Sequence, residues 1–107
     1  MKYDNCLCVE YVTFKLKKGI SIEIFRKCSD ELDANFLANE DGFLSRKLLL
    51  LHDGETWADL AFWRDTTAAK AAEEKFMKDP VTKAYGDLVD MDTIKMEHSN
   101  EVSYFVK

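Results

Sequence analysis

The sequence has few features that would bind nucleic acid or cross a membrane. It carries 15 Lys and Arg against 20 Asp and Glu, a formal net charge of -5, and the acidic residues are spread along the chain. This charge repels phosphate backbones, so we expect no nucleic-acid partner. No apolar run approaches the ~20 residues needed to span a bilayer, and the N-terminus lacks a signal-peptide pattern. We therefore expect a cytoplasmic protein with no membrane partner.

Cysteine is also scarce, and its spacing disfavours both disulfides and metal. Cys6, Cys8 and Cys28 form no CxxC pair, and an odd number of cysteines makes a disulfide framework improbable. Cys6 and Cys8 point to the same side of a predicted strand, but two thiols without a histidine make a poor metal site. The sequence holds no Gly-rich phosphate loop, nucleotide fingerprint or Ser-His-Asp arrangement. We therefore expect no metal and no cofactor.

Apolar residues are plentiful, and they suffice for one folded domain. Of the 107 residues, 47% are hydrophobic and 12% are aromatic. A chain of this length is near the common domain size and can bury most of its apolar surface without the help of disulfides or metal ions. The chain shows no internal repeat, linker or low-complexity segment, so a single domain is predicted over 1–107.

The clearest local signal is the stretch from Gly42 to Arg64, in which two apolar runs flank Asp53-Gly54. An Asp-Gly pair in this position is typical of a β-hairpin closed by a type I′ turn. Such a turn needs positive φ at both central residues, and these two residues tolerate it. The stretch is therefore predicted to be a pair of antiparallel strands.

Hydrophobic periodicity and capping residues predict the elements around this hairpin. Ser21 and Asp65 are candidate helix caps, Asp79-Pro80 begins a short third helix, and Gly42 is a candidate for the left-handed conformation. In chain order the prediction is a strand over 6–17, a helix of about five turns after Ser21, the hairpin, an Ala-rich helix to Met77, the short helix, and a strand over 91–97. Residues 99–107 are predicted to form a further short strand or an arm.

This order predicts an α+β fold of the ferredoxin-like kind. Right-handed crossovers convert βαββαβ into a four-stranded antiparallel sheet with both main helices on one face. The other face would expose Leu7, Val9, Tyr11 and part of the run Leu48 to Leu51, a larger apolar patch than soluble monomers usually carry. We therefore expect a homodimer in which two sheets pack face to face through an isologous interface.

Several short motifs follow one another in a characteristic order. They are the strand ending at Lys18-Gly19, Gly42-Phe43-Leu44-Ser45-Arg46, the strand ending at Phe62-Trp63, the Ala-rich helix, Asp79-Pro80 and Met96-Glu97-His98. In this order they resemble the dimeric α/β-barrel superfamily, and within it the antibiotic-biosynthesis-monooxygenase-like domains. The resemblance covers nearly the whole chain.

The resemblance implies a cavity between the sheet and the helices of each protomer. Members of the family include cofactor-independent oxygenases of polyketide-like or quinol substrates, haem-degrading enzymes and many proteins of unknown role, so the fold alone does not settle function. The haem-degrading branch resembles a set with an Asn, a Trp and a His at positions where this sequence has Val12, Ala72 and Tyr85. Haem is therefore not expected as a substrate.

Glu10 and His98 are the candidate catalytic residues. Glu10 lies among Cys8, Val12 and Phe14 on one side of the first strand, where desolvation raises the pKa of a carboxyl group. His98 lies on the last strand, which should pair with the first, so the two side chains can exchange a proton at neutral pH. The alternatives are a Glu10 side chain that reaches water or binds an Arg, and an exposed His98 at a frayed strand end.

The second strand of the hairpin supplies candidate substrate-binding residues, because Trp57, Asp59 and Trp63 share one of its faces. The two Trp rings either line a cavity for a flat or elongated apolar ligand or fill the core. A carboxylate in the middle of a sheet needs a partner. Arg46 on the adjacent strand can form a structural ion pair with Asp59.

Phe76 and Tyr85, on the two helices after the hairpin, complete the substrate-binding candidates, with a place in the core as the alternative. The first functional hypothesis is cofactor-independent monooxygenation of an apolar organic molecule. Glu10 or His98 would remove a proton from a phenol-like substrate that Trp57 and Tyr85 orient. The alternative is non-enzymatic binding or sequestering of a hydrophobic metabolite such as a fatty acid.

Overall fold

Four strands form one antiparallel sheet in the computed structural model, which describes residues 2–107. They are β1 (Cys8–Leu16), β2 (Phe43–Leu50), β3 (Thr56–Trp63) and β4 (Val89–Asn100), arranged in the order β2-β3-β1-β4. β1 and β3 are the central strands, because β1 pairs with both β3 and β4. The predicted ferredoxin-like α+β fold is confirmed.

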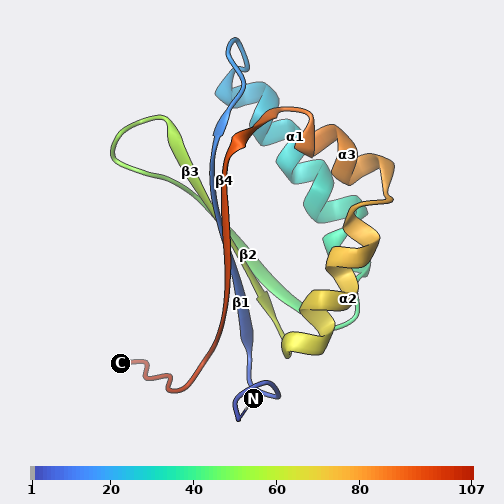
Figure 1. Ribbon diagram of the computed structural model, residues 1–107, viewed down its shortest axis with the longest axis vertical. Helices are drawn as coiled ribbons and strands as arrows, with labels where there is room; N and C mark the ends of the chain where they lie inside the picture. Colours follow the sequence, from blue (N-terminus) through green and yellow to red (C-terminus); the bar gives the residue numbers. More distant parts are fainter. Residues whose placement is uncertain (1) are drawn as a thin grey trace.

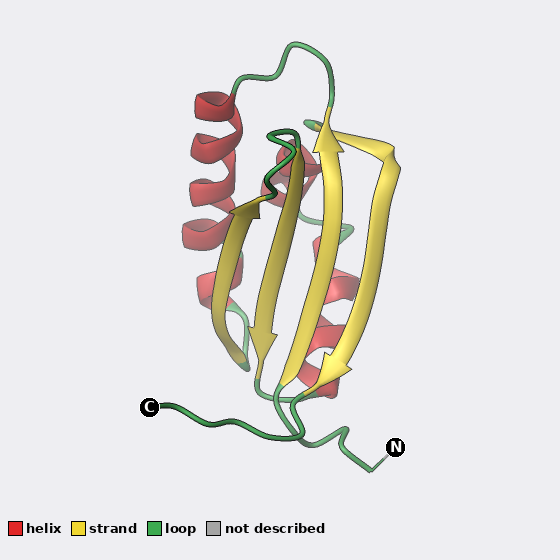
Figure 2. Ribbon diagram, turned by 90° about the vertical axis from the view of Figure 1, so that its left-hand side faces the viewer, coloured by secondary structure: helices red, strands yellow, loops and turns green. Residues whose placement is uncertain are grey.

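All the described helices cover the same face of this sheet (Figure 1). They are α1 (Ile22–Asn35), the short 3-10 helix η1 (Leu37–Asn39), α2 (Thr66–Phe76) and α3 (Pro80–Gly86). The core lies between the two layers, with Phe25, Leu32 and Trp63 among its largest fully buried side chains. Viewed from the other side, the sheet has none of the described helices in front of it (Figure 2).

The helix caps predicted at Ser21 and Asp65 are confirmed, and the third helix begins at Asp79-Pro80 as predicted, with Asp79 as its cap. Side-chain oxygens of Ser21, Asp65 and Asp79 accept hydrogen bonds from backbone N–H groups in the first turns of α1, α2 and α3, at 3.1, 2.9 and 2.8 Å. α1 has 14 residues, which is about four turns rather than the predicted five. It is shorter because Phe36 leaves the helical region, with φ −125° and ψ −66°, before the chain tightens into η1.

The hairpin is confirmed, but the prediction of a type I′ turn is wrong. Five residues lie between β2 and β3, and among the described residues only glycines have positive φ, so Asp53 does not adopt the conformation that turn requires. Asp53 instead accepts hydrogen bonds from the backbone N–H groups of Glu55 and Thr56, at 2.9 and 2.8 Å. These bonds and one from the Thr56 hydroxyl lower the pKa of Asp53 to about 2. The side chain therefore closes a longer loop.

Gly42 takes the predicted left-handed conformation where the chain enters β2, with φ 83°. The same position is also crowded. A Cβ atom there would lie 2.6 Å from the Cβ of Ala68 on α2. Glycine therefore permits both the turn and the close approach of α2 to the sheet.

The last strand is longer than predicted. β4 runs from Val89 to Asn100 rather than over 91–97, and its register against β1 shifts between Thr13 and Lys15. A bulge of this kind lets a strand bend and keep pairing beyond the irregular residue. The extension carries His98 into the sheet opposite Glu10.

The C-terminal segment predicted as a strand or an arm divides into two parts. Ser99 and Asn100 complete β4, whereas residues 101–107 form no helix or strand and extend away from the end of the sheet (Figure 2). Val102, Tyr104 and Phe105 in this arm are 69%, 74% and 89% exposed. The arm thus presents apolar side chains that this protomer does not cover.

Cys6, Cys8 and Cys28 are all free thiols, and Cys8 is fully buried. Cys8 therefore packs as a small apolar side chain of the core. None of the described helices is long and apolar enough to cross a membrane.

Candidate functional site

A cavity of about 380 Å³ lies between the sheet and the helices. This volume falls in the usual range for small-molecule sites. Its wall is mainly apolar and includes Val12, Phe14, Leu32, Phe36, Ala61 and Phe76. Strand alternation explains the wall, because every second residue of β1 and β3 faces the helices.

Two groups of polar side chains interrupt this apolar wall. The first, which we call the acid–histidine cluster, consists of Glu10 on β1, Glu73 on α2 and His98 on β4. The second, the arginine cluster, consists of Arg46 on β2, Asp59 on β3 and Tyr85 on α3. All of these residues except His98 line the cavity.

The acid–histidine cluster forms because Glu10 and His98 are paired residues of adjacent strands, and α2 carries Glu73 toward them. His98 Nε2 lies 3.8 Å from Glu10 Oε2 and contacts Glu73 Oε1 directly. Trp63 Nε1 donates a hydrogen bond of 2.5 Å to Glu10 Oε1. The indole of Trp63 therefore binds one carboxyl oxygen of Glu10, and the other oxygen faces His98.

The two carboxyl groups of the cluster differ in their protonation. Burial, together with the hydrogen bond and charge of Glu73, raises the pKa of Glu10 from 4.5 to about 8. Burial would also raise the pKa of Glu73, but hydrogen bonds with Glu10 and His98 outweigh it and lower that pKa. At neutral pH the pair therefore holds one proton on Glu10, and Glu73 carries the negative charge.

The arginine cluster is a closed ion pair. Arg46 Nε and Nη2 donate to the two oxygens of Asp59 at 2.9 and 2.8 Å, and the Arg46 side chain is 4% exposed. The remaining guanidinium hydrogen bonds go to Ser29, Asp33 and Tyr85 at 2.7, 2.9 and 3.1 Å. The structural ion pair predicted between Asp59 and Arg46 is thus present, with further partners that the sequence did not indicate.

Tyr85 completes this cluster as a neutral phenol. Its hydroxyl donates to Asp59 Oδ2 at 2.9 Å. Burial and the charge of Asp59 raise the pKa of Tyr85 well above its ordinary value of 10.0. Neither Tyr85 nor Arg46, whose pKa is raised by Asp59, therefore loses a proton near neutral pH, and the guanidinium donors of Arg46 are already committed.

The open side of the cavity is formed by flexible apolar side chains. Met77 of the turn after α2 and Met91 and Met96 of β4 line the cavity and are 84%, 65% and 46% exposed. These are all the methionines within the described residues. Their unbranched side chains adapt to ligands of different shape, so this rim suits the entry of an apolar molecule.

The structure brings most of the predicted site residues to one cavity. Glu10, Asp59, Trp63, Phe76 and Tyr85 all line it, and His98 lies beside it. Trp57 does not line the cavity: it is 6% exposed and packs in the core, with its ring centroid 4.9 Å from that of Phe25. These contacts of Trp57 match the alternative in which its ring fills the core.

Glu73 is the site residue that the sequence reasoning missed. It follows Ala69 by four residues and precedes Phe76 by three, and Ala69 is fully buried. This spacing places Glu73 on the inward side of α2, where a carboxylate is unusual. Helical periodicity, applied to charged as well as apolar residues, would have placed Glu73 on the inward side of α2 but not beside Glu10 and His98.

The acid–histidine cluster also has the ligand types that a metal ion uses. Glu10, Glu73 and His98 each offer one ligand atom, and these atoms lie within 4.8 Å of one another. The sequence-based expectation of no metal did not take this grouping into account. The cluster is already connected by direct contacts, Glu73 to His98 and Trp63 to Glu10, and these suit the sharing of protons.

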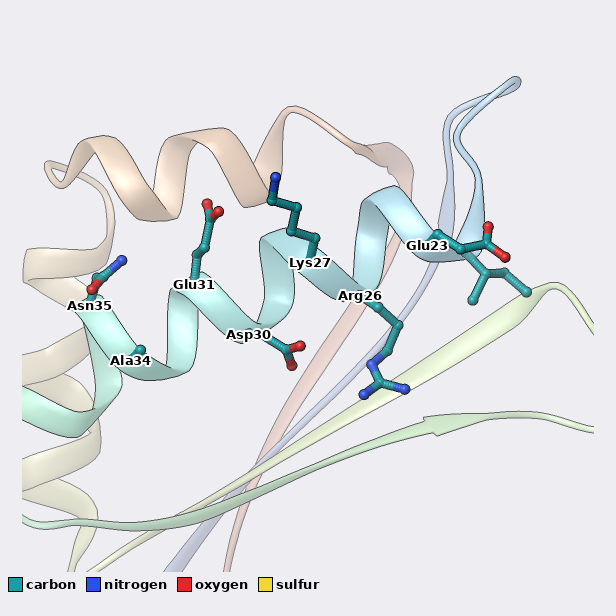
Figure 3. A pocket seen from close by; sticks show the side chains of 8 residues that line it. Glu23, Arg26, Lys27, Asp30, Glu31, Ala34 and Asn35 are labelled. Carbon is teal, nitrogen blue, oxygen red and sulfur yellow. The ribbon is translucent and has the colours of Figure 1, made fainter.

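A second depression of about 680 Å³ lies along the outer side of α1. All of its lining residues belong to that single helix, and most are charged (Figure 3). Lys27 and Glu31 project to one side of the helix, and Arg26 and Asp30 project to the other. One helix surface cannot enclose a ligand, so we assign this depression to the solvated face of α1.

Comparison with known proteins gives structural but no sequence matches. No protein-family model matches the sequence, and neither does any curated protein. The structure is similar to SnoaB, a cofactor-independent oxygenase from Streptomyces nogalater, with TM-score 0.72, 18% identity, and 94% of this chain and 98% of that chain covered. It is also similar to a monooxygenase from the gene ActVA-Orf6 of Streptomyces coelicolor, in complex with nanaomycin D, with TM-score 0.67, 19% identity and 96% and 94% covered.

A third similar structure is a dimeric ferredoxin-like protein from an uncultured marine organism. Its TM-score is 0.72 at 13% identity, with 98% of this chain and 96% of that chain covered. At these identities the similarity establishes the fold over nearly the whole chain. The protein therefore has the ferredoxin-like fold of these structures, which is the fold that the resemblance in its sequence implies.

Proposed function

We propose that the protein binds a neutral phenol-like molecule between its sheet and helices and oxidises it with dioxygen without a bound cofactor. One observation carries this proposal: an apolar cavity of about 380 Å³ that is lined by the Glu73 carboxylate and, among its described lining residues, by no cation with free hydrogen-bond donors. The ionised Glu73 carboxylate accepts hydrogen bonds, as phenol hydroxyls require. The shared fold with a cofactor-independent oxygenase and with a monooxygenase supports the same reaction class.

The same cavity disfavours a carboxylate ligand such as a fatty acid. Among the described lining residues Arg46 is the sole cation, and its donors are committed to Asp59, Ser29, Asp33 and Tyr85. A ligand carboxylate would therefore be desolvated without a counter-ion, which is costly. If the protein instead binds a hydrophobic metabolite without converting it, that metabolite should also be neutral.

In the proposed reaction, the acid–histidine cluster removes the hydroxyl proton of the ligand. The electron pair stays on the phenolate and is available to dioxygen, and a phenol plus dioxygen then gives a quinone plus water. Trp63 and Phe76 would pack against the ring, and Asp59 and Tyr85 would bound the other polar end of the cavity. Glu10 and His98, the catalytic candidates from the sequence, both belong to this cluster, together with Glu73.

Oxygen uptake with two-ring phenols such as 1-naphthol tests this function. We expect one dioxygen consumed per quinone formed, without added cofactor. Ala72→Leu narrows the cavity and should lower the rate about tenfold, whereas Ala71→Leu on the exposed side of α2 should not. Absence of oxygen uptake with every phenol tried would refute the oxygenase proposal. Binding of the phenols without oxygen uptake would favour the non-enzymatic alternative.

We also propose that the protein is a homodimer joined through the open face of its sheet. Val9 pairs with Phe62 and Tyr11 pairs with Leu60, so these side chains share that face with Leu49. Tyr11 and Leu49 are 40% and 46% exposed, and none of the described helices lies over this face of the sheet (Figure 2). A second copy of the sheet would remove this patch from water through an isologous contact.

Light scattering tests the dimer. The wild type should have twice the mass of the chain, and Tyr11→Glu should give a folded monomer because it places a charge in the apolar patch. Ile24→Glu, on the exposed side of α1, is the control and should remain dimeric. A wild-type monomer across micromolar concentrations would contradict the proposal.

We place the protein in the cytoplasm. The support is chemical: Cys6, Cys8 and Cys28 are free thiols, and unpaired cysteines persist in reducing compartments. Fractionation of cells that express the protein at its natural level would test this location.

A further inference from the structure

We propose that Glu73 accepts the proton of the bound ligand and that His98 passes this proton to solvent, so that the two residues form a proton exit from the cavity. This inference rests on the proposed function and identifies the residues that carry its first step. It gives a role to Glu73, which no sequence motif marks.

The positions of the three cluster residues define the direction of this path. Glu10 lies at the closed end, with its side chain 11% exposed. Glu73 lines the cavity and contacts His98, and their side chains are 33% and 32% exposed. A proton accepted from a ligand by Glu73 is therefore one contact away from an imidazole that reaches water.

Glu10 is poorly placed to be the outlet itself. One of its oxygens is held by the indole of Trp63, and the other lies 3.8 Å from His98 Nε2. Glu10 also shares a hydrogen bond with the carboxylate of Glu73. Its proton stabilises the negative charge of Glu73 in the resting protein, so Glu10 acts as a positioning residue.

Other charged groups around the cluster favour the same assignment. Lys70, one turn earlier on α2, lowers the pKa of Glu73, whereas Asp59 on β3 raises that of Glu10. The thiol of Cys8 faces both carboxyl groups and Asp65, and burial and these charges raise its pKa. The thiol therefore stays protonated, and Glu73 is the anionic base that the cavity presents.

The proton balance of the step is simple. The ligand O–H bond breaks, its electron pair stays on the ligand oxygen, and the proton forms an O–H bond with Glu73. In the resting protein the Nε2–H of His98 donates to the ionised Glu73, so once Glu73 is protonated the imidazole first exchanges this proton through water for one on Nδ1. Glu73 then gives its proton to the freed Nε2, and Nδ1 releases a proton to water. Glu73 is an anion and His98 is neutral again, so neither residue is consumed.

Ligand binding without turnover tests Glu73. Under nitrogen, we compare the Kd of 1-naphthol with that of its methyl ether, which cannot donate a hydrogen bond. Wild type and Glu74→Gln, on the exposed side of α2, should prefer the naphthol by at least tenfold. Glu73→Gln should lose most of this preference. An unchanged preference in Glu73→Gln would overturn the assignment, and a wild type that binds neither compound would instead refute the proposed ligand class.

Chemical rescue tests His98. His98→Ala should lower the kcat of oxygen uptake at least tenfold with little change in KM, and added imidazole should restore it by replacing the missing proton carrier. His52→Ala, in the exposed hairpin loop, should match the wild type with and without imidazole. Urea unfolding of each variant checks that the fold is intact. An unchanged kcat, or a loss that imidazole does not reverse in a folded His98→Ala protein, would overturn the exit path.

Discussion

Replacing Arg46 by Met should be the most destabilising single change in the site. The Arg46 side chain is 4% exposed and its partner Asp59 is 15% exposed, so the pair lies almost entirely out of water. Met has a similar length and fills the space of the guanidinium stem. The substitution therefore removes the charge of Arg46 with little loss of packing and leaves Asp59 with the hydrogen bond of Tyr85 alone.

The size of the effect follows from the hydrogen bonds that are lost. Asp59 loses two charged hydrogen bonds from Arg46, each worth about 1.5–3 kcal/mol net. Breaking a buried ion pair by removing one partner costs about 3–5 kcal/mol, which agrees with that sum. A domain of this size has a total stability of about 5–15 kcal/mol, so Arg46→Met should remove about a fifth of it or more.

Urea unfolding followed by circular dichroism measures this loss. The double variant Arg46→Met with Asp59→Leu should recover most of the stability, because it removes both charges together. Asp59→Leu alone should cost less than Arg46→Met, since Arg46 keeps Asp33 and Ser29 as partners. A loss below about 1 kcal/mol in Arg46→Met, or a double variant no more stable than Arg46→Met, would refute the view that burial makes this pair interdependent.

Three further predictions concern other parts of the structure. Between pH 4.5 and about 8 the folded protein keeps a proton on Glu10 that the unfolded chain loses, so wild-type stability falls as pH rises through this range. The variant Glu10→Gln has no such proton, so its stability should not fall over this pH range. Urea unfolding should show it about 1–3 kcal/mol more stable than wild type at pH 8 and equally stable near pH 4. Gly42→Ala should cost about 2–5 kcal/mol in the same assay through its positive φ and a clash with Ala68, whereas Gly19→Ala, with positive φ and open space, should cost about 1–2 kcal/mol. Treatment with EDTA should leave oxygen uptake unchanged, and a loss restored by one metal would assign the acid–histidine cluster to that metal.

Local signals in the sequence were sufficient for the fold. The caps at Ser21 and Asp65 and the helix start at Asp79-Pro80 depend on residues close together in the sequence, so the structure contains them as predicted. The turn after β2 was mispredicted because the Asp53 side chain competes with the backbone for the hydrogen bonds of the loop. The length of β4 also escaped prediction, since a bulge opposite β1 has no signal in a single sequence.

The sequence predicted the contacts of the candidate site that depend on strand pairing. It did not predict those that depend on how a helix packs against the sheet. Antiparallel pairing of the first and last strands already placed Glu10 near His98, and adjacent strands placed Arg46 near Asp59. Glu73 joins the first pair only because α2 packs across the sheet at a particular rotation. That rotation is set by tertiary contacts of small residues, which sequence spacing does not specify.

The two polar clusters of the cavity differ in a way that decides which of them does chemistry. In the arginine cluster, Arg46 and Asp59 compensate each other and Tyr85 is held as a phenol, so neither Arg46 nor Tyr85 releases a proton near pH 7. In the acid–histidine cluster, two carboxyl groups share one proton beside an imidazole that reaches water. Proton transfer needs a group whose protonation can change at the working pH, and only the second cluster offers one within the described cavity. The arginine cluster therefore fixes the shape of the cavity, and the acid–histidine cluster is where a bound phenol would be ionised.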